Sequence, residues 1–83
     1  MEQNKENQLM QDLALVLIYL SSWEEKNIAD QIIHRCWKGY DFNILDQLKE
    51  KGLIEFSYTA KSLYISEEGL QKAQMLLAKF EKV

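Results

Sequence analysis

The sequence of 83 residues has no proline, three glycines, one cysteine and one histidine. One cysteine cannot form an internal disulfide, and one cysteine with one histidine is too few for a zinc site, which needs three or four ligands. His34 and Cys36 are two positions apart, so on a helix they would point to different faces. The sequence also lacks a glycine-rich phosphate loop, a serine nucleophile motif and a pair of suitably spaced carboxylates. We therefore expect no enzymatic activity, no metal and no cofactor.

Long hydrophobic runs are also missing. The longest, Leu13–Leu20, has eight residues, whereas a membrane-spanning helix needs about 20. The N-terminus lacks the basic and apolar segments of a signal peptide, so we expect no membrane contact and a cytoplasmic location, where a free thiol is stable. Because no linker-like composition divides the chain, we expect a flexible N-terminus over residues 1–7 and one domain over residues 8–83.

The net charge of −3 argues against a general binder of polyanions. The charge is uneven along the chain, with −4 over residues 1–30, +1 over residues 31–61 and zero over residues 62–83. The middle segment is the only one with a positive balance. Its cations are Arg35, Lys38, Lys49, Lys51 and Lys61.

Helical periodicity predicts a first helix over about residues 8–21. Apolar side chains recur on one face of this segment at Leu9, Leu13, Val16, Leu17 and Leu20. Met10, Ala14 and Ile18 fill most of the other side, and a helix that is apolar nearly all round is buried on more than one side. This helix is therefore expected either at the centre of the core or in a subunit interface.

A second helix is predicted from somewhere in residues 23–28 to about Cys36, because Ser22 and Glu25 have the spacing of a capping box. Two apolar stripes with a spacing of four residues, one beginning at Ile28 and one at Ala29, would form its buried face. A turn follows over residues 37–41, and Asp41 is the expected N-cap of a third helix over residues 42–51.

After this helix the spacing of the apolar residues changes from a period of 3.6 residues to a period of 2 residues. Residues 53–58 and 62–65 are predicted to be strands joined by a short loop at residues 59–61, and Ser66 is the expected cap of a last helix that ends near Lys82. The expected fold is mainly α with a small β-hairpin (α+β), in the order helix-helix-helix-strand-strand-helix. This order is typical of a winged helix-turn-helix domain.

Two motifs resemble winged helix-turn-helix domains of bacterial transcription regulators. They are the stretch Leu45–Ile54, with Lys51-Gly52 at the end of the helix, and the stretch Tyr64–Gly69. Together with Ala14-Leu15-x-x-x-Tyr19-Leu20 and Trp37-Lys38-Gly39-Tyr40-Asp41, they more closely resemble a family of short bacterial proteins with a domain of unknown function. This resemblance implies the fold over about residues 12–80 and says little about function.

The expected fold favours double-stranded DNA as a partner, because the third helix of a winged helix-turn-helix domain enters the major groove. Asn43 and Gln47 would then read bases, the five cations of the middle segment would contact phosphates, and the wing would be residues 53–65. Against this, the helix over residues 41–51 has a net charge of −1. The candidate residues for contact with nucleic acid or a protein partner are Arg35, Lys38, Tyr40, Asn43, Gln47, Lys49, Lys51 and Lys61.

The alternative is a protein-interaction or dimerisation module that does not bind DNA. A small domain without a disulfide or metal is only marginally stable, so a homodimer through the helices over residues 8–21 and 66–82 would help it. Trp37 and Tyr40 beside Lys38 fit a patch that binds a base or a protein partner. Burial tendencies favour a different interpretation of Trp37, as a side chain that fills the core.

Overall fold

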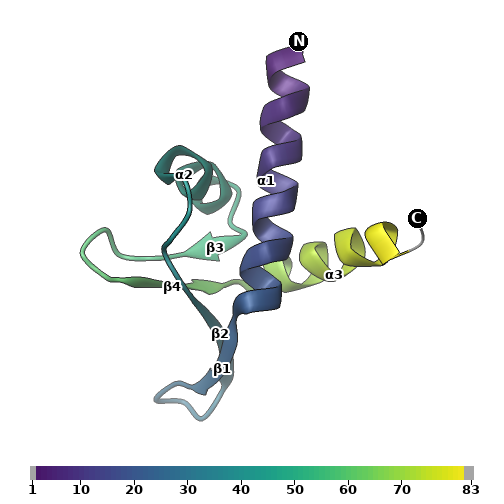
Figure 1. The fold of residues 1–83 in the computed structure, drawn as a ribbon. Helices are drawn as coiled ribbons and strands as arrows, with labels where there is room; N and C mark the ends of the chain where they lie inside the picture. The colour runs from purple at the N-terminus through teal and green to yellow at the C-terminus, as the bar shows by residue number, and fades with distance from the viewer. Residues whose placement is uncertain (1, 82–83) are drawn as a thin grey trace.

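The computed structural model describes residues 2–81, which form three helices and one four-stranded antiparallel sheet (Figure 1). The strand order in the sheet is β1-β2-β4-β3. The elements are α1 (Glu2–Ser21), β1 (Trp23–Lys26), β2 (Ile32–Trp37), α2 (Phe42–Glu50), β3 (Ile54–Glu55), β4 (Ser62–Ile65) and α3 (Glu67–Glu81).

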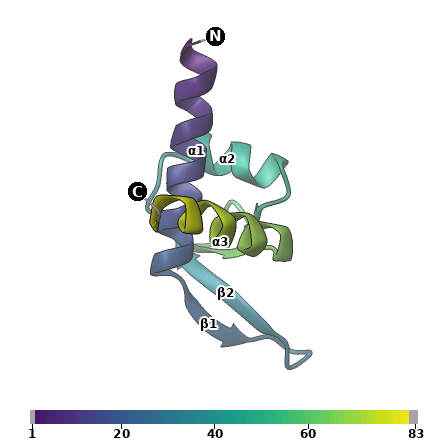
Figure 2. The same ribbon diagram turned by 90° about the vertical axis from the view of Figure 1, so that its right-hand side faces the viewer.

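The predicted winged helix-turn-helix order is wrong, because the segment predicted as the second helix is a β-hairpin. The observed order is α, β, β, α, β, β, α, which is an α+β fold with a sheet of four strands rather than a two-stranded wing. The hairpin of β1 and β2 projects away from the helices in both views (Figures 1 and 2). β2 also pairs with β4, so the hairpin extends the sheet.

The turn between β1 and β2 explains why this segment is not helical. The Asn27 side-chain oxygen accepts hydrogen bonds from the backbone N–H of Ala29 at 2.9 Å and of Gln31 at 3.0 Å. Asp30 has a φ of 63°, a left-handed conformation that aspartate tolerates better than most residues. Ser22, predicted to cap a helix, instead donates its hydroxyl to the Tyr19 carbonyl at the end of α1.

Elsewhere the local signals match the structure. Asp41 caps α2, since its carboxylate accepts from the backbone N–H of Asn43 and Ile44. Gly52 follows α2 with a φ of 75°, and the Ser66 hydroxyl accepts from the Gly69 N–H in the first turn of α3. The first helix, predicted from about Gln8, begins at Glu2.

The core lies between one face of the sheet and the three helices. The sheet contributes Cys36, Ile54, Leu63 and Ile65, all of which are buried. The helices contribute Leu15 and Ile18 from α1, Ile44, Leu45 and Leu48 from α2, and Ala73 from α3. Cys36 is 3% exposed and fills the core as a small apolar side chain.

Gly69 allows α3 to approach the sheet closely. A Cβ atom at this position would lie 2.0 Å from the Leu53 carbonyl oxygen and 2.8 Å from Cγ2 of Ile65. The same carbonyl accepts the backbone N–H of Ser66 at 3.0 Å. The glycine is therefore required by packing.

A polar contact joins α1 to α2. Gln11, which is buried, donates from Nε2 to Asn7 Oδ1 at 2.6 Å and to Gln47 Oε1 at 3.2 Å. Its own Oε1 is buried without a hydrogen-bond partner among the described residues. Burying an unpaired polar atom lowers stability, so this contact fixes the position of α1 on α2 at a cost in free energy.

Candidate functional site

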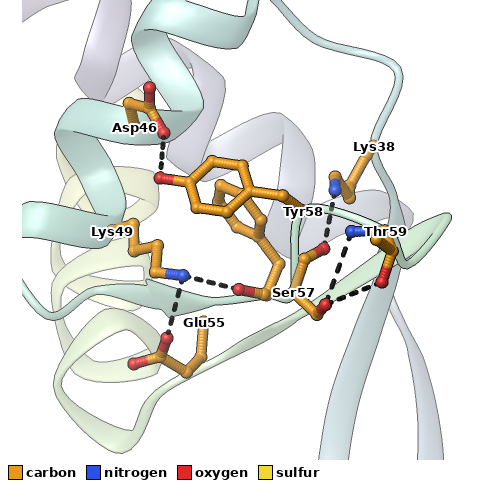
Figure 3. A network of polar contacts seen from close by, with 8 residues as sticks. Lys38, Asp46, Lys49, Glu55, Ser57, Tyr58 and Thr59 are labelled. Carbon is orange, nitrogen blue, oxygen red and sulfur yellow. Dashed lines mark hydrogen bonds and ion pairs between the residues drawn. The ribbon is translucent and has the colours of Figure 1, made fainter.

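Lys49, predicted to contact phosphate, lies in a polar cluster that holds the β3–β4 connection against α2 (Figure 3). Its Nζ donates to the Phe56 carbonyl at 2.6 Å and lies 3.6 Å from a carboxylate oxygen of Glu55. It also lies 4.6 and 4.8 Å from the ring centres of Phe56 and Tyr58. These contacts give the ammonium group a structural role.

Tyr58 completes this cluster. Its hydroxyl donates to Asp46 Oδ1 at 3.0 Å, and this hydrogen bond, followed by desolvation and the negative charges of Asp46 and Glu50, raises the pKa of Tyr58 above its usual value (Figure 3). The hydrogen bond favours the neutral phenol, because a phenolate beside a carboxylate would be repelled.

Lys38 anchors the same connection from the other side. Its Nζ donates to the carbonyls of Ser57 at 3.0 Å and Ala60 at 2.9 Å, and it lies 4.5 Å from the Phe56 ring centre (Figure 3). The ammonium groups of Lys38 and Lys49 thus lie close to the same aromatic ring. Contact with a phosphate would compete with these bonds within the protein.

Of the remaining candidate residues, Lys61 lies beside this cluster, because its carbonyl accepts the backbone N–H of Lys38 at 3.1 Å, and the others are placed as follows. Lys51 donates to Gln8 Oε1 at 2.8 Å, and the half-buried Gln47 accepts from Gln11, so both face α1. The Tyr40 hydroxyl lies 3.4 Å from the Ser21 hydroxyl at the end of α1. Asn43 and Lys61 are exposed, and Arg35 lies on the sheet.

The face of the sheet opposite the core, here called the outer sheet face, carries a row of aromatic and charged side chains. In the strand register Trp23 pairs with Arg35, and Arg35 pairs with Tyr64. Trp37, two residues after Arg35, is 63% exposed, so the expectation that it fills the core is wrong. Its ring centre lies 5.1 Å from that of Trp23.

The charges of the outer sheet face have partners, either on this face or on α2. Arg35 lies 3.4 Å from a carboxylate oxygen of Glu25 and donates to the Ser62 hydroxyl at 3.3 Å. The other oxygen of Glu25 accepts from Trp23 Nε1 at 2.6 Å. Glu55 is paired with Lys49 as described above. The outer sheet face is therefore aromatic, with Arg35 as its central cation.

A second surface lies on α1 and is apolar. Five large side chains, here called the leucine stripe, are 43–58% exposed: Leu9, Met10, Leu13, Leu17 and Leu20. At 100° per residue they fall on one side of the helix, while Leu15 and Ile18 on the opposite side are buried in the core. The sequence therefore indicated an apolar α1 but did not indicate which side faces the core.

A shallow groove runs beside the leucine stripe, between α1 and the start of α2. It has a volume of about 230 Å³, and its lining is apolar apart from Asp41 and the Tyr40 hydroxyl: Met10, Leu13, Ala14, Leu17, Tyr40, Asp41 and Ile44. Small-molecule sites commonly enclose about 300–1,000 Å³. The groove is therefore better suited to side chains of another protein surface than to a ligand.

Two further findings concern membrane-spanning helices and metal sites. Within residues 2–81, no helix is long and apolar enough to cross a membrane. Across the same part of the chain, no three residues of the types His, Cys, Asp and Glu are grouped as metal ligands would be.

The chain belongs to a family defined by a domain of unknown function, DUF6429, whose model matches residues 6–83. It is 36% identical over 67 residues to the uncharacterized protein y4hR of Sinorhizobium fredii, and the match covers 78% of each chain. No solved structure matches the chain. The resemblance to a family of unknown function is confirmed, and neither of the two matches supports a winged helix.

Proposed function

We propose that this member of the DUF6429 family is a non-catalytic protein-interaction module that binds its partner through the leucine stripe of α1. The observation that carries the proposal is the exposure of five large apolar side chains along one side of a single helix. Contiguous apolar patches larger than a few hundred Å² are uncommon on soluble monomers and commonly mark interaction sites.

The energy available from this surface is comparable to the cost of association. Covering one half-exposed leucine or methionine contributes about 1 kcal/mol, so the stripe contributes about 5 kcal/mol and an equal partner surface doubles this. Association costs about 4–15 kcal/mol in lost translational and rotational freedom. A partner must therefore cover the whole stripe, because a single turn contributes too little to offset this cost.

Photocrosslinking tests this proposal while the partner is still unidentified. The photoreactive amino acid p-benzoylphenylalanine replaces Leu17 in the stripe, and in a matched control it replaces Gln71, an exposed residue of α3. We expect a discrete protein adduct in native cells from the Leu17 variant and much less from the Gln71 variant. Equal adduct yields, or no adduct at Leu17, would contradict a binding role for the stripe.

Nucleic acid is the second candidate partner, and the observation that favours it is the outer sheet face. The exposed Trp37 and Tyr64 flank Arg35, an arrangement that suits stacking of unpaired bases. Double-stranded DNA on α2, expected from the sequence, is less favoured because Lys38, Lys49, Lys51 and Gln47 already bond within the protein.

Fluorescence anisotropy with a labelled single strand and the matched duplex, at low and high salt, tests the second candidate. If it is correct, the single strand binds more tightly than the duplex, and Trp37→Ala weakens binding while Met75→Ala on α3 does not. Absence of binding to either nucleic acid at low salt would rule out this candidate for the purified chain, because electrostatic attraction is strongest there.

A further inference from the structure

We propose that the partner of the leucine stripe is a second copy of this chain, with the two α1 helices packed antiparallel around a twofold axis between Leu13 and Leu17. This inference rests on the proposed function, and it goes further by naming the partner and its orientation. Three features of the molecule support it: the spacing of the stripe, its charge, and the area that the chain exposes.

The side chains of the leucine stripe are spaced so that two copies of the stripe can face each other when the helices run antiparallel. With residue 15 of each helix at the axis, Leu13 lies opposite Leu17 of the partner, and Leu9 and Met10 lie opposite Leu20 of the partner. Each contact occurs twice, as a closed twofold interface requires. The stripe extends over about 16 Å of helix at 1.5 Å per residue, so one continuous apolar seam forms.

Charge opposes the parallel alternative. Glu6 is exposed and lies three residues before Leu9, on the stripe side of α1. Parallel helices would place the two Glu6 carboxylates side by side, where they repel each other. Antiparallel helices place the two carboxylates about 27 Å apart along the axis, well beyond the screening length of about 8 Å at physiological salt.

The chain exposes more surface than a compact monomer of its mass. It exposes 6011 Å², whereas a compact monomer of 9.8 kDa is expected to expose about 5,200 Å². The excess of roughly 800 Å² comes from the projecting hairpin as well as from the leucine stripe, and it is comparable to the area of about 800 Å² that each partner buries in an interface of standard size. The radius of gyration of 12.9 Å likewise exceeds the roughly 11.8 Å expected for 83 residues.

Disulfide trapping tests the orientation. We would mix the full chain carrying Leu9→Cys with a tagged chain carrying Leu20→Cys and oxidise the mixture. In the antiparallel dimer these positions are offset by about 1.5 Å along the axis, whereas two copies of position 9 are about 18 Å apart, too far for a disulfide. We expect mixed disulfides only, and none from the unsubstituted chain, whose Cys36 is buried.

Light scattering tests the second copy itself. We expect twice the chain mass of 9.8 kDa for the unsubstituted protein, and a dissociation constant raised at least about tenfold by Leu17→Glu, because both copies carry the change. Met75→Glu on α3 is the matched control, since Met75 is 59% exposed and Leu17 is 55% exposed. Circular dichroism confirms that both variants are folded.

Three outcomes would overturn the inference: disulfides from Leu9→Cys alone, a monomer at high concentration, or loss of the dimer through Met75→Glu but not Leu17→Glu. These outcomes are separable from failure of the proposed function. If the chain is monomeric but still gives a Leu17 adduct with another protein, the proposed interaction module is supported and the homodimer is excluded. If the chain gives no Leu17 adduct, both proposals are excluded.

Discussion

Replacement of Gly69 by alanine is expected to destabilise the protein, although alanine is the better helix former. The new Cβ would lie 2.0 Å from the Leu53 carbonyl oxygen, so α3 and β3 must separate by at least 1 Å to restore an ordinary contact. That shift also stretches the Ser66 N–H bond to the same oxygen from 3.0 Å. Overpacking costs about 1–3 kcal/mol and the weakened hydrogen bond about 1 kcal/mol, against a helix-propensity gain of at most about 1 kcal/mol.

The net loss is about 2 kcal/mol, which lowers the melting temperature of a domain of this size by roughly 10 °C. The other two glycines are controls. Gly39→Ala meets no atom within 4 Å and should change stability by less than about 0.5 kcal/mol. Gly52→Ala also meets none, but its φ of 75° makes a cost of about 1 kcal/mol expected.

Urea unfolding followed by circular dichroism gives the free energy of unfolding of each of the three glycine variants. All are measured at one protein concentration, because dimerisation would make the values concentration-dependent. The expected order of destabilisation is Gly69→Ala, then Gly52→Ala, then Gly39→Ala. A neutral or stabilising Gly69→Ala would refute the close packing of α3 on the Leu53 carbonyl, and with it the argument that this glycine is required by packing.

Three single contacts give the remaining predictions. Gln11→Leu should lower the free energy of unfolding by about 1 kcal/mol in the same assay, because it removes one buried oxygen without a partner but also both hydrogen bonds of Nε2, including the bond to Gln47. Asp30→Gly should stabilise the β1–β2 turn or leave it unchanged, because glycine adopts a positive φ freely, and a loss of stability in that assay would contradict the hairpin. Tyr58 should ionise later than a free tyrosine in an absorbance titration, since its pKa is raised, and Asp46→Asn should lower that pKa. The stabilisation from this contact is present below the usual tyrosine pKa and is lost as the pH rises through the raised value.

Most local elements of this chain could be predicted because their signals are contained within a few residues. Asp41 bonds the backbone two and three residues away, and the alternation around Ile54 and Ile65 has period 2. The segment over residues 23–37 could not be predicted in this way. Its apolar residues recur every fourth position, which is a helical spacing, whereas the charged Arg35 stands between Ile33 and Trp37 and interrupts the apolar alternation typical of a strand.

Pairing with a distant strand decides between these two periods. β2 aligns His34 with Ile65 and Cys36 with Leu63, so its inward residues join the core through β4. Such pairing depends on residues nearly thirty positions away, and strand preference depends on that context. The partners of two candidate cations within the protein could not be predicted for a related reason: the carbonyls that bind Lys38 and Lys49 belong to the β3–β4 connection, whose path the sequence alone does not determine.

The wrong prediction of a helix over residues 23–36 and the exposed side of α1 in the proposed interface have the same physical cause. A helix over residues 23–36 would have been a fourth helix with its own apolar stripe, available to cover the outer side of α1. As a hairpin, the same residues pair with β4 and project away from the helices, so within residues 2–81 the side of α1 that carries Leu13 and Leu17 stays exposed. The sheet thus gains two strands at the expense of a covered α1, and a second α1 supplies the missing apolar layer in the arrangement that we propose.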